Sequence, residues 1–246
     1  MSKIFFYPNE SSIIEEKFVE VLHKLKKFFK KAEIKIIEQP LINFKNIKTY
    51  SEKFVISKIS NLFSEAQPEV VFKQELEFEE NFLLNHIKNT QVYDAFKIQE
   101  IYKELIKYKL NESHIVFTHR IIATFDTLDK RYHSRVVLLG YPCIVSIAGL
   151  YYALSLPKQE YIKKFLNLIP QDNRKLEVEK NLDKFLSKYV IQCIIYIFFD
   201  SFFCSNRDCL HFDNHFFDEV LSQIKKIKSK SLPLCSRHKN LLSNIL

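Results

Sequence analysis

Glycine and tryptophan are scarce in this sequence: its 246 residues include two glycines and no tryptophan. Two glycines are too few for the glycine-rich loops that hold phosphates in P-loop and dinucleotide-binding proteins, so these classes are excluded. Long apolar runs are missing as well. The most apolar segment, YVIQCIIYIFFDSFF, contains Gln192 and Asp200 and is short for a membrane span, which predicts that no membrane is a partner.

The N-terminal stretch MSKIFFYPNESS has too short an apolar run for a signal peptide. We therefore expect a cytoplasmic protein, in which thiols stay reduced. The five cysteines then favour a metal site over disulfides.

The net charge of +8 raises the question of a nucleic-acid partner. The lysines are spread over predicted helix faces, and acidic residues are interleaved elsewhere, which is typical of solvated surfaces. We therefore disfavour nucleic acid as a partner and rank a basic nucleic-acid binder third among the possible functions.

The hydrophobic pattern predicts a single α/β domain over residues 1–246. The N-terminal part, 1–112, opens with a β-α-β unit, in which KIFFY and AEIKIIEQP are strands on either side of an amphipathic helix. The middle part, 113–156, is β-rich. The C-terminal part, 157–246, is helical.

Two helices of the C-terminal part bear on function. Residues 183–200 form a predicted helix with almost no polar side, which should be buried on most faces. The segment DNHFFDEVLSQIKKIKSK forms another, with Asp213 as N-cap and His215 in its first turn.

Two pairs of soft ligands frame this second helix. Cys204-x4-Cys209 precedes it, and Cys235-x2-His238 follows it. Three thiolates and one imidazole would fill the tetrahedral shell of one Zn²⁺, and such a closed shell is structural. The alternative is that the thiols are buried and His238 is a surface histidine; His211 and His215 are competing ligands.

The order of these features resembles the archaemetzincins, a family of zinc metallopeptidases. The β-α-β start is followed by a Thr-x-Arg turn at 118–120 and a strand similar to V-x-I-S-x-x-x-L, with Val145, Ser146 and Leu150. The C-x4-C and C-x2-H pairs come last. An archaeal group described as metallopeptidases of this type is more similar still, around RYHSR (131–135) and GYPCIVS (140–146).

The archaemetzincin catalytic motif, HExxHxxGxxHC, is absent from this sequence. Aligned on Cys204, its three histidines, glutamate and glycine meet other residues, namely Cys193, Ile194, Ile197, Asp200 and Phe203, and the methionine of its Met-turn meets His211. The resemblance therefore implies a metzincin-like mixed sheet and a structural zinc without the catalytic one. We expect a non-proteolytic binding or scaffold protein with a peptide or protein partner. A sheet edge is one place where such a peptide could bind.

A second hypothesis is an enzyme that uses a polar cluster around the turn TLDKRYH. Asp126, Arg131, His133 and Arg135 lie there, and His119 precedes them. Such groups bind carboxylates or phosphates, or transfer protons; the alternative is a structural turn with Arg–Asp pairs. A pocket that joins this cluster to His215 would favour the enzyme, whereas an apolar groove would favour the binding protein.

Overall fold

The computed structural model describes residues 3–8, 16–26, 29, 31–67, 70–85, 90–109, 112–154, 174–228 and 231–243. A five-stranded sheet has the order β2-β1-β4-β8-β7, in which the first four strands are parallel and β7 is antiparallel. These strands are β1 (Lys3–Tyr7), β2 (Glu33–Ile36), β4 (Glu112–Thr118), β7 (Val137–Leu138) and β8 (Cys143–Ser146). The predicted α/β class with a mixed sheet is confirmed.

The predicted β-α-β start is present as well. Helix α1 (Glu16–Lys26) connects β1 to β2, which pair in parallel. The crossover helix packs on one face of the sheet, where Val21, Leu22 and Leu25 join the core.

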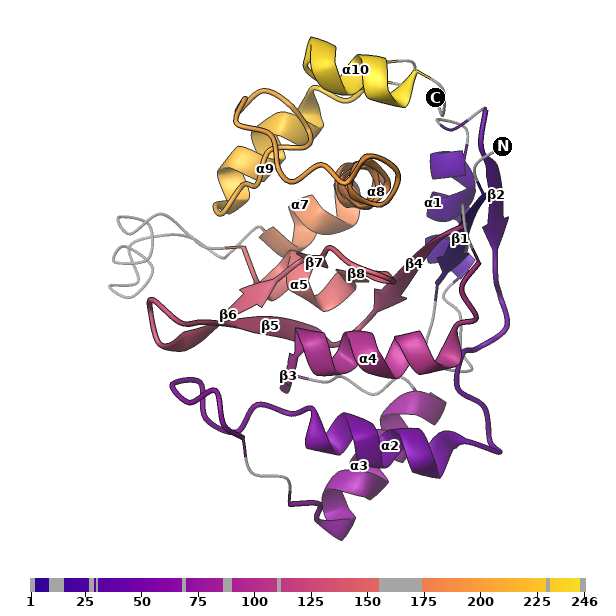
Figure 1. Ribbon diagram of the computed structural model, residues 1–246, viewed down its shortest axis with the longest axis vertical. Coiled ribbons are helices and arrows are strands. Elements are labelled where there is room, and N and C mark those ends of the chain that lie inside the picture. Colours follow the sequence, from indigo (N-terminus) through magenta and orange to yellow (C-terminus); the bar gives the residue numbers. More distant parts are fainter. Residues whose placement is uncertain are drawn as a thin grey trace.

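A smaller sheet continues from the first. It contains β3 (Val92–Asp94), β5 (Ile121–Asp126) and β6 (Arg131–Arg135) in the order β3-β5-β6. β4 leads into β5, and β6 leads into β7, so the β5–β6 hairpin extends from the main sheet (Figure 1). The predicted β-rich middle part is therefore correct up to Ser146. Helix α5 (Ile147–Tyr152) begins there because the Ser146 hydroxyl accepts a hydrogen bond from Gly149 N at 2.7 Å.

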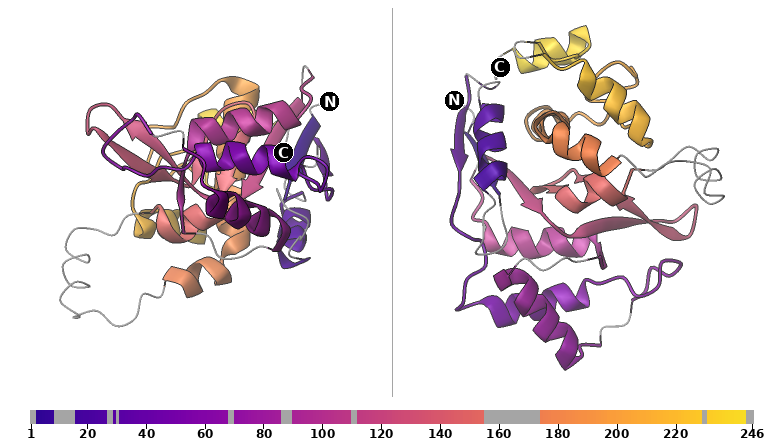
Figure 2. Two further views of the ribbon diagram at one scale, coloured as in Figure 1. Left: turned by 90° about the horizontal axis from the view of Figure 1, so that it is seen from below. Right: turned by 180° about the vertical axis from the view of Figure 1, so that it is seen from behind.

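Helices cover both faces of the main sheet (Figures 1 and 2). Alternate strand residues point to the two sides: Phe6 and Phe117 pack with α1 and α8, whereas Tyr7 and Val116 pack with α2 and α4. The helices of the second side are α2 (Ile47–Ile56), α3 (Lys73–Asn85) and α4 (Ala95–Leu105). Helix α3, with the sequence KQELEFEENFLLN, is acidic.

Helix α8 (Leu182–Phe199) matches the predicted helix over 183–200, and its residues 185–195 are all buried. The other described helices of the C-terminal part are α7 (Arg174–Lys180), α9 (Phe217–Lys225) and α10 (Ser236–Leu242). Residues 155–173, where the helical part was predicted to begin, lie outside the described residues. Across the parts of the chain that the structure covers, no helix is both long and apolar enough to cross a membrane.

The predicted start of α9 was wrong. The helix begins at Phe217 with Phe216 at the N-cap position, so Asp213 does not cap it and His215 lies before its first turn. Phe217 is buried against Phe185 of α8, with ring centroids 5.9 Å apart, and this packing fixes where the helix starts.

Candidate metal centre and adjoining groove

The structure brings the four predicted ligands together. Cys204, Cys209, Cys235 and His238 each offer one ligand atom, and these atoms all lie within 4.8 Å of one another. Cys204 and Cys209 belong to the loop after α8, whereas Cys235 and His238 lie at the start of α10. An ion bound among them would join two segments that α9 separates in sequence.

The spacing of the four atoms suits zinc. Tetrahedral Zn²⁺ with ordinary bond lengths places two sulfurs about 3.8 Å apart, and a sulfur and a nitrogen about 3.6 Å apart. Here Cys204 Sγ and Cys235 Sγ are 3.9 Å apart. His238 Nδ1 lies 3.4 Å from Cys209 Sγ and 3.1 Å from Cys235 Sγ. The donor set therefore fits a metal, and these three distances lie within about 0.5 Å of the tetrahedral values.

The protonation of the ligands also suits a metal. Burial, and then the neighbouring Arg237, lower the pKa of His238, so its imidazole is neutral and can offer a lone pair. Burial raises the pKa of the Cys209 thiol to about 11. A bound cation reverses this effect because a coordinated thiol is deprotonated outright.

Three polar side chains hold the Cys204–Cys209 loop in place. Lys188 Nζ on α8 donates to the carbonyls of Leu210 and Phe212 and to Gln223 Oε1, each at 2.9 Å. Gln192, one turn along α8, donates to the same two carbonyls. Gln223 on α9 donates to Cys209 O at 3.2 Å. These hydrogen bonds therefore position the backbone around Cys209 from two helices.

A groove of about 630 Å³ reaches Phe202 and Phe203, which directly precede the Cys204–Cys209 loop. One wall is the stretch 131–139, which comprises β6, β7 and the residues next to them. The opposite side contains Tyr189 and Tyr196 of α8 and the segment 213–215. The groove thus runs between the edge strand of the main sheet and the most buried helix.

The groove unites most of the polar cluster that the sequence singled out. Arg131, His133 and Arg135 line it from β6, and His215 lines it from the other side. His119 and Asp126 do not line it. The Asp126 carboxylate accepts hydrogen bonds from the backbone N–H groups of Leu128 and Asp129, so it stabilises the hairpin turn, and these bonds lower its pKa.

Two histidines of the groove have carboxylate neighbours. His133 Nε2 lies 3.1 Å from Asp129 Oδ2, and His215 Nε2 lies 4.0 Å from Asp213 Oδ2. Asp129, which also pairs with Arg131 at 3.3 Å, is exposed at the hairpin tip. These pairs place an imidazole beside a carboxylate at two points of the groove.

Comparison with known families decides where the chain belongs. The sequence matches the probable metallopeptidase family (DUF6775) over residues 1–245. The chain belongs to this family. No curated protein and no solved structure matches it.

Within this metallopeptidase-family fold, α8 is the helix on which the archaemetzincin alignment places the catalytic residues. Cys193 and Ile194, aligned with the first histidine and the glutamate, are fully buried. Ile197 packs against the same core, and Phe203 is partly exposed beside the groove. The isoleucines and the phenylalanine can neither bind zinc nor act as a general base, and burial raises the pKa of the Cys193 thiol.

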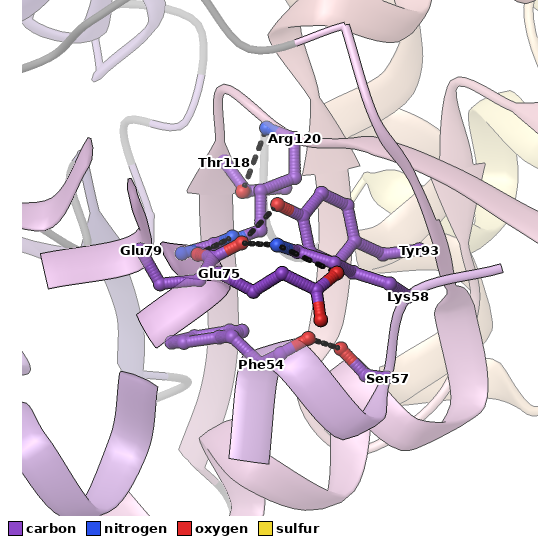
Figure 3. A network of polar contacts seen from close by, with 8 residues as sticks. All are labelled: Phe54, Ser57, Lys58, Glu75, Glu79, Tyr93, Thr118 and Arg120. Atoms are coloured by element: carbon purple, nitrogen blue, oxygen red, sulfur yellow. Dashed lines mark hydrogen bonds and ion pairs between the residues drawn. The ribbon is translucent and has the colours of Figure 1, made fainter. Parts of the chain in front are cut away.

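A buried ionic network on the other side of the molecule escaped the sequence analysis (Figure 3). Arg120 Nη1 lies 2.6 Å from Glu79 Oε2, and both side chains are fully buried. Glu79 also pairs with Lys58 at 3.3 Å and accepts a hydrogen bond from the Tyr93 hydroxyl. The guanidinium of Arg120 lies 3.7 Å from the ring centre of Phe54. The network therefore ties α2 and α3 to the strands.

Proposed function

We propose that this member of the metallopeptidase family is an archaemetzincin-like homologue that binds one structural Zn²⁺ and does not cleave peptides with a catalytic zinc. Its function is to bind an extended peptide in the groove between β7 and α8. One observation carries this proposal: the groove lies against the helix aligned with the catalytic motif, and that helix contributes tyrosines there.

The structural role of the zinc follows from its ligands. Three thiolates and one imidazole complete a tetrahedral shell and leave no position for a water molecule that could attack a peptide bond. The ion would join the loop after α8 to α10, so its binding energy contributes to folding.

The absence of zinc-dependent cleavage follows from α8 itself. A metzincin site requires three imidazoles and a glutamate base around an open zinc position. The sequence of α8, LDKFLSKYVIQCIIYIFF, contains neither histidine nor glutamate in any register. The nearby His211, whose Nε2 donates to the carbonyls of Ser201 and Phe202, is a single imidazole and cannot replace three histidines and a glutamate.

Peptide binding is supported by the position of the groove along a sheet edge. β7 is the last strand of the main sheet, so among the described residues no further strand pairs with its other side. An extended peptide can add to such an edge through main-chain hydrogen bonds. Aromatic side chains on the opposite side, Tyr196, Phe202 and Phe203, offer apolar contacts for its side chains.

A second candidate function is acid–base catalysis in the same groove. The observation that favours it is the joining of His133 and Arg135 to Asp213 and His215 in one pocket. A pocket that joins these groups is the feature expected of an enzyme. The groups present can transfer protons to or from a bound ligand without a metal.

One experiment tests both candidates. Purified protein is incubated with a pool of random fluorescein-labelled heptapeptides; binding is followed by anisotropy and cleavage by mass spectrometry. The proposal expects binding without cleavage. Cleavage that survives chelation and is lost in His133→Ala would establish the second candidate instead. Cleavage that needs a metal and is lost in His215→Ala would overturn the proposed absence of catalytic zinc.

A further inference from the structure

Arg135 stands out among the cations of the groove because no carboxylate among the described residues contacts it, although Asp126 on the neighbouring strand lies near enough to interact with its charge. Its Nε donates to Thr124 Oγ1 at 2.9 Å, which holds one edge of the guanidinium. In the portion of the chain that the structure describes, no carboxylate lies within ion-pair distance of Arg135. Arg131, four residues earlier on the same strand, is by contrast paired with Asp129. A half-buried arginine whose guanidinium contacts no carboxylate is suited to receive an anion from a ligand.

The backbone of Arg135 is held firmly. It is the last residue of β6, at the point where the chain passes from the small sheet to the main one. Helix α5 packs on it so closely that a Cβ atom added to Gly149 would lie 2.6 Å from the carbonyl oxygen of Arg135. The next residue, Val136, accepts a hydrogen bond from Ser146 N at 2.7 Å. The guanidinium is thus presented from a rigid position.

The strand edge next to Arg135 has a limited length. Tyr132 N, farther back on β6, already donates to Leu62 O at 2.8 Å, and the Tyr132 hydroxyl donates to Asp94. The loop around Leu62 therefore occupies the edge of β6 at this residue. A peptide strand that is added along β7 and continues along this edge would meet the loop at Tyr132, so its end would fall within the stretch 133–135, which includes Arg135.

Charge decides which end of the peptide lies there. A strand antiparallel to β7 would run toward Arg135 and place its C-terminal carboxylate beside the guanidinium. A parallel strand would place its N-terminal ammonium there, next to a like charge. The guanidinium fork forms two parallel hydrogen bonds with a carboxylate, which gives both affinity and orientation.

We propose that the groove recognises the free C-terminus of an extended peptide, with Arg135 as the residue that binds its carboxylate and β7 as the strand that it extends. This inference rests on the proposed peptide-binding function and adds the class of ligand. It assigns Arg135 the role of a specificity-determining residue.

The test compares two forms of one peptide pool: fluorescein-labelled random heptapeptides with a free C-terminal carboxylate, and the same pool with a C-terminal amide. Both contain the same Asp and Glu side chains, so only recognition of the terminus separates them. Anisotropy titrations of the wild-type protein should give a dissociation constant at least about tenfold lower for the acid pool, because a charge-assisted pair contributes about 1.5–3 kcal/mol.

Arg135→Gln should remove this preference and leave the affinity for the amide pool unchanged. Lys130→Gln, which removes the same charge from the hairpin outside the groove, should keep the preference. Zinc content and the unfolding temperature report whether Arg135→Gln is folded, and the wild-type comparison holds independently of that variant. Equal affinity of the wild-type protein for both pools would overturn the inference and leave peptide binding standing. Binding of neither pool would overturn both.

Discussion

The Cys3His cluster and the buried ionic network stabilise different parts of the protein by different means. The cluster joins the loop after α8 to α10, and the network joins α2 and α3 to the strands. The Arg120–Glu79 network on the side of α2 and α3 is complete within the chain, because each charge meets its partner and aromatic rings surround the cation. The Cys3His cluster on the side of α8 brings together groups that gain stability only around a cation. One side of the protein therefore depends on a bound metal, and the other does not.

Removal of a metal ligand should have the largest effect. We expect Cys209→Ala to lose the zinc and to lower the free energy of unfolding by more than about 5 kcal/mol, because structural zinc contributes about 10–16 kcal/mol in zinc-finger peptides. Thermal unfolding and metal analysis measure both quantities. Cys143→Ala, at a buried thiol outside the cluster, should keep its zinc. Equal metal content in the two variants would contradict the assignment of Cys209.

The buried ion pair should come next. Glu79→Gln leaves the guanidinium of Arg120 buried without its counter-charge, which costs about 3–5 kcal/mol. Denaturant unfolding measures the loss, and zinc content should stay at the wild-type value because the network lies away from the cluster. Glu75→Gln is the matched control, since Glu75 is partly exposed and 3.9 Å from Lys58. A similar loss in both variants would show that burial of Glu79 is not the cause.

A smaller, pH-dependent effect is expected at Lys188. Burial lowers the pKa of this lysine to about 7 in the folded protein, whereas an unfolded lysine titrates near ~10.4. Between these values the unfolded chain holds a proton that the folded protein releases, so this group makes stability rise with pH above about 7 and leaves it constant below. Lys188→Met should lose that rise and about 1–3 kcal/mol, because two carbonyls lose their donor.

Urea unfolding from pH 6 to 9 measures the slope for both proteins. Lys184→Met, a neighbouring half-buried lysine of α8, serves as the control and should keep the wild-type slope. An identical slope in Lys188→Met would show that the pH dependence originates elsewhere.

The smallest effect is expected at an exposed ion pair between the Cys204–Cys209 loop and the end of α9. Asp208 and Lys226 lie 2.8 Å apart, and both are largely exposed. Asp208→Asn should change the free energy of unfolding by less than about 1 kcal/mol because water screens the pair. Zinc content should remain unchanged. A loss as large as that of Glu79→Gln would mean that exposure does not separate the two pairs.

The sequence predicted features that depend on local pattern. The β-α-β start and the apolar helix over 183–200 follow from hydrophobic periodicity, and the Cys3His cluster follows from ligand spacing. Contacts between residues far apart in the sequence could not be predicted. Glu79 lies on an acidic helix that resembles a solvated one, and its partner Arg120 is 41 positions away. Lys188 was missed because a single lysine in an apolar helix gives no sign of the carbonyls that it will meet.

The groove shows the same limit. The turn TLDKRYH drew attention to Arg131, His133 and Arg135, but α8 and the segment 213–215 complete the pocket only after folding. The start of α9 was misplaced because Asp213 suits an N-cap, whereas the packing of Phe217 against Phe185 decides where the helix begins. That the chain forms a single domain remains a prediction.

The central claim is that the protein holds one zinc ion in a closed structural site and none in a catalytic one. X-ray absorption at the zinc edge, with metal analysis of protein purified without chelator, tests it directly. We predict about one zinc per chain, with three sulfur ligands at about 2.3 Å and one nitrogen at about 2.0–2.1 Å. Two zinc ions per chain, or a shell of nitrogen and oxygen that includes water, would contradict this account.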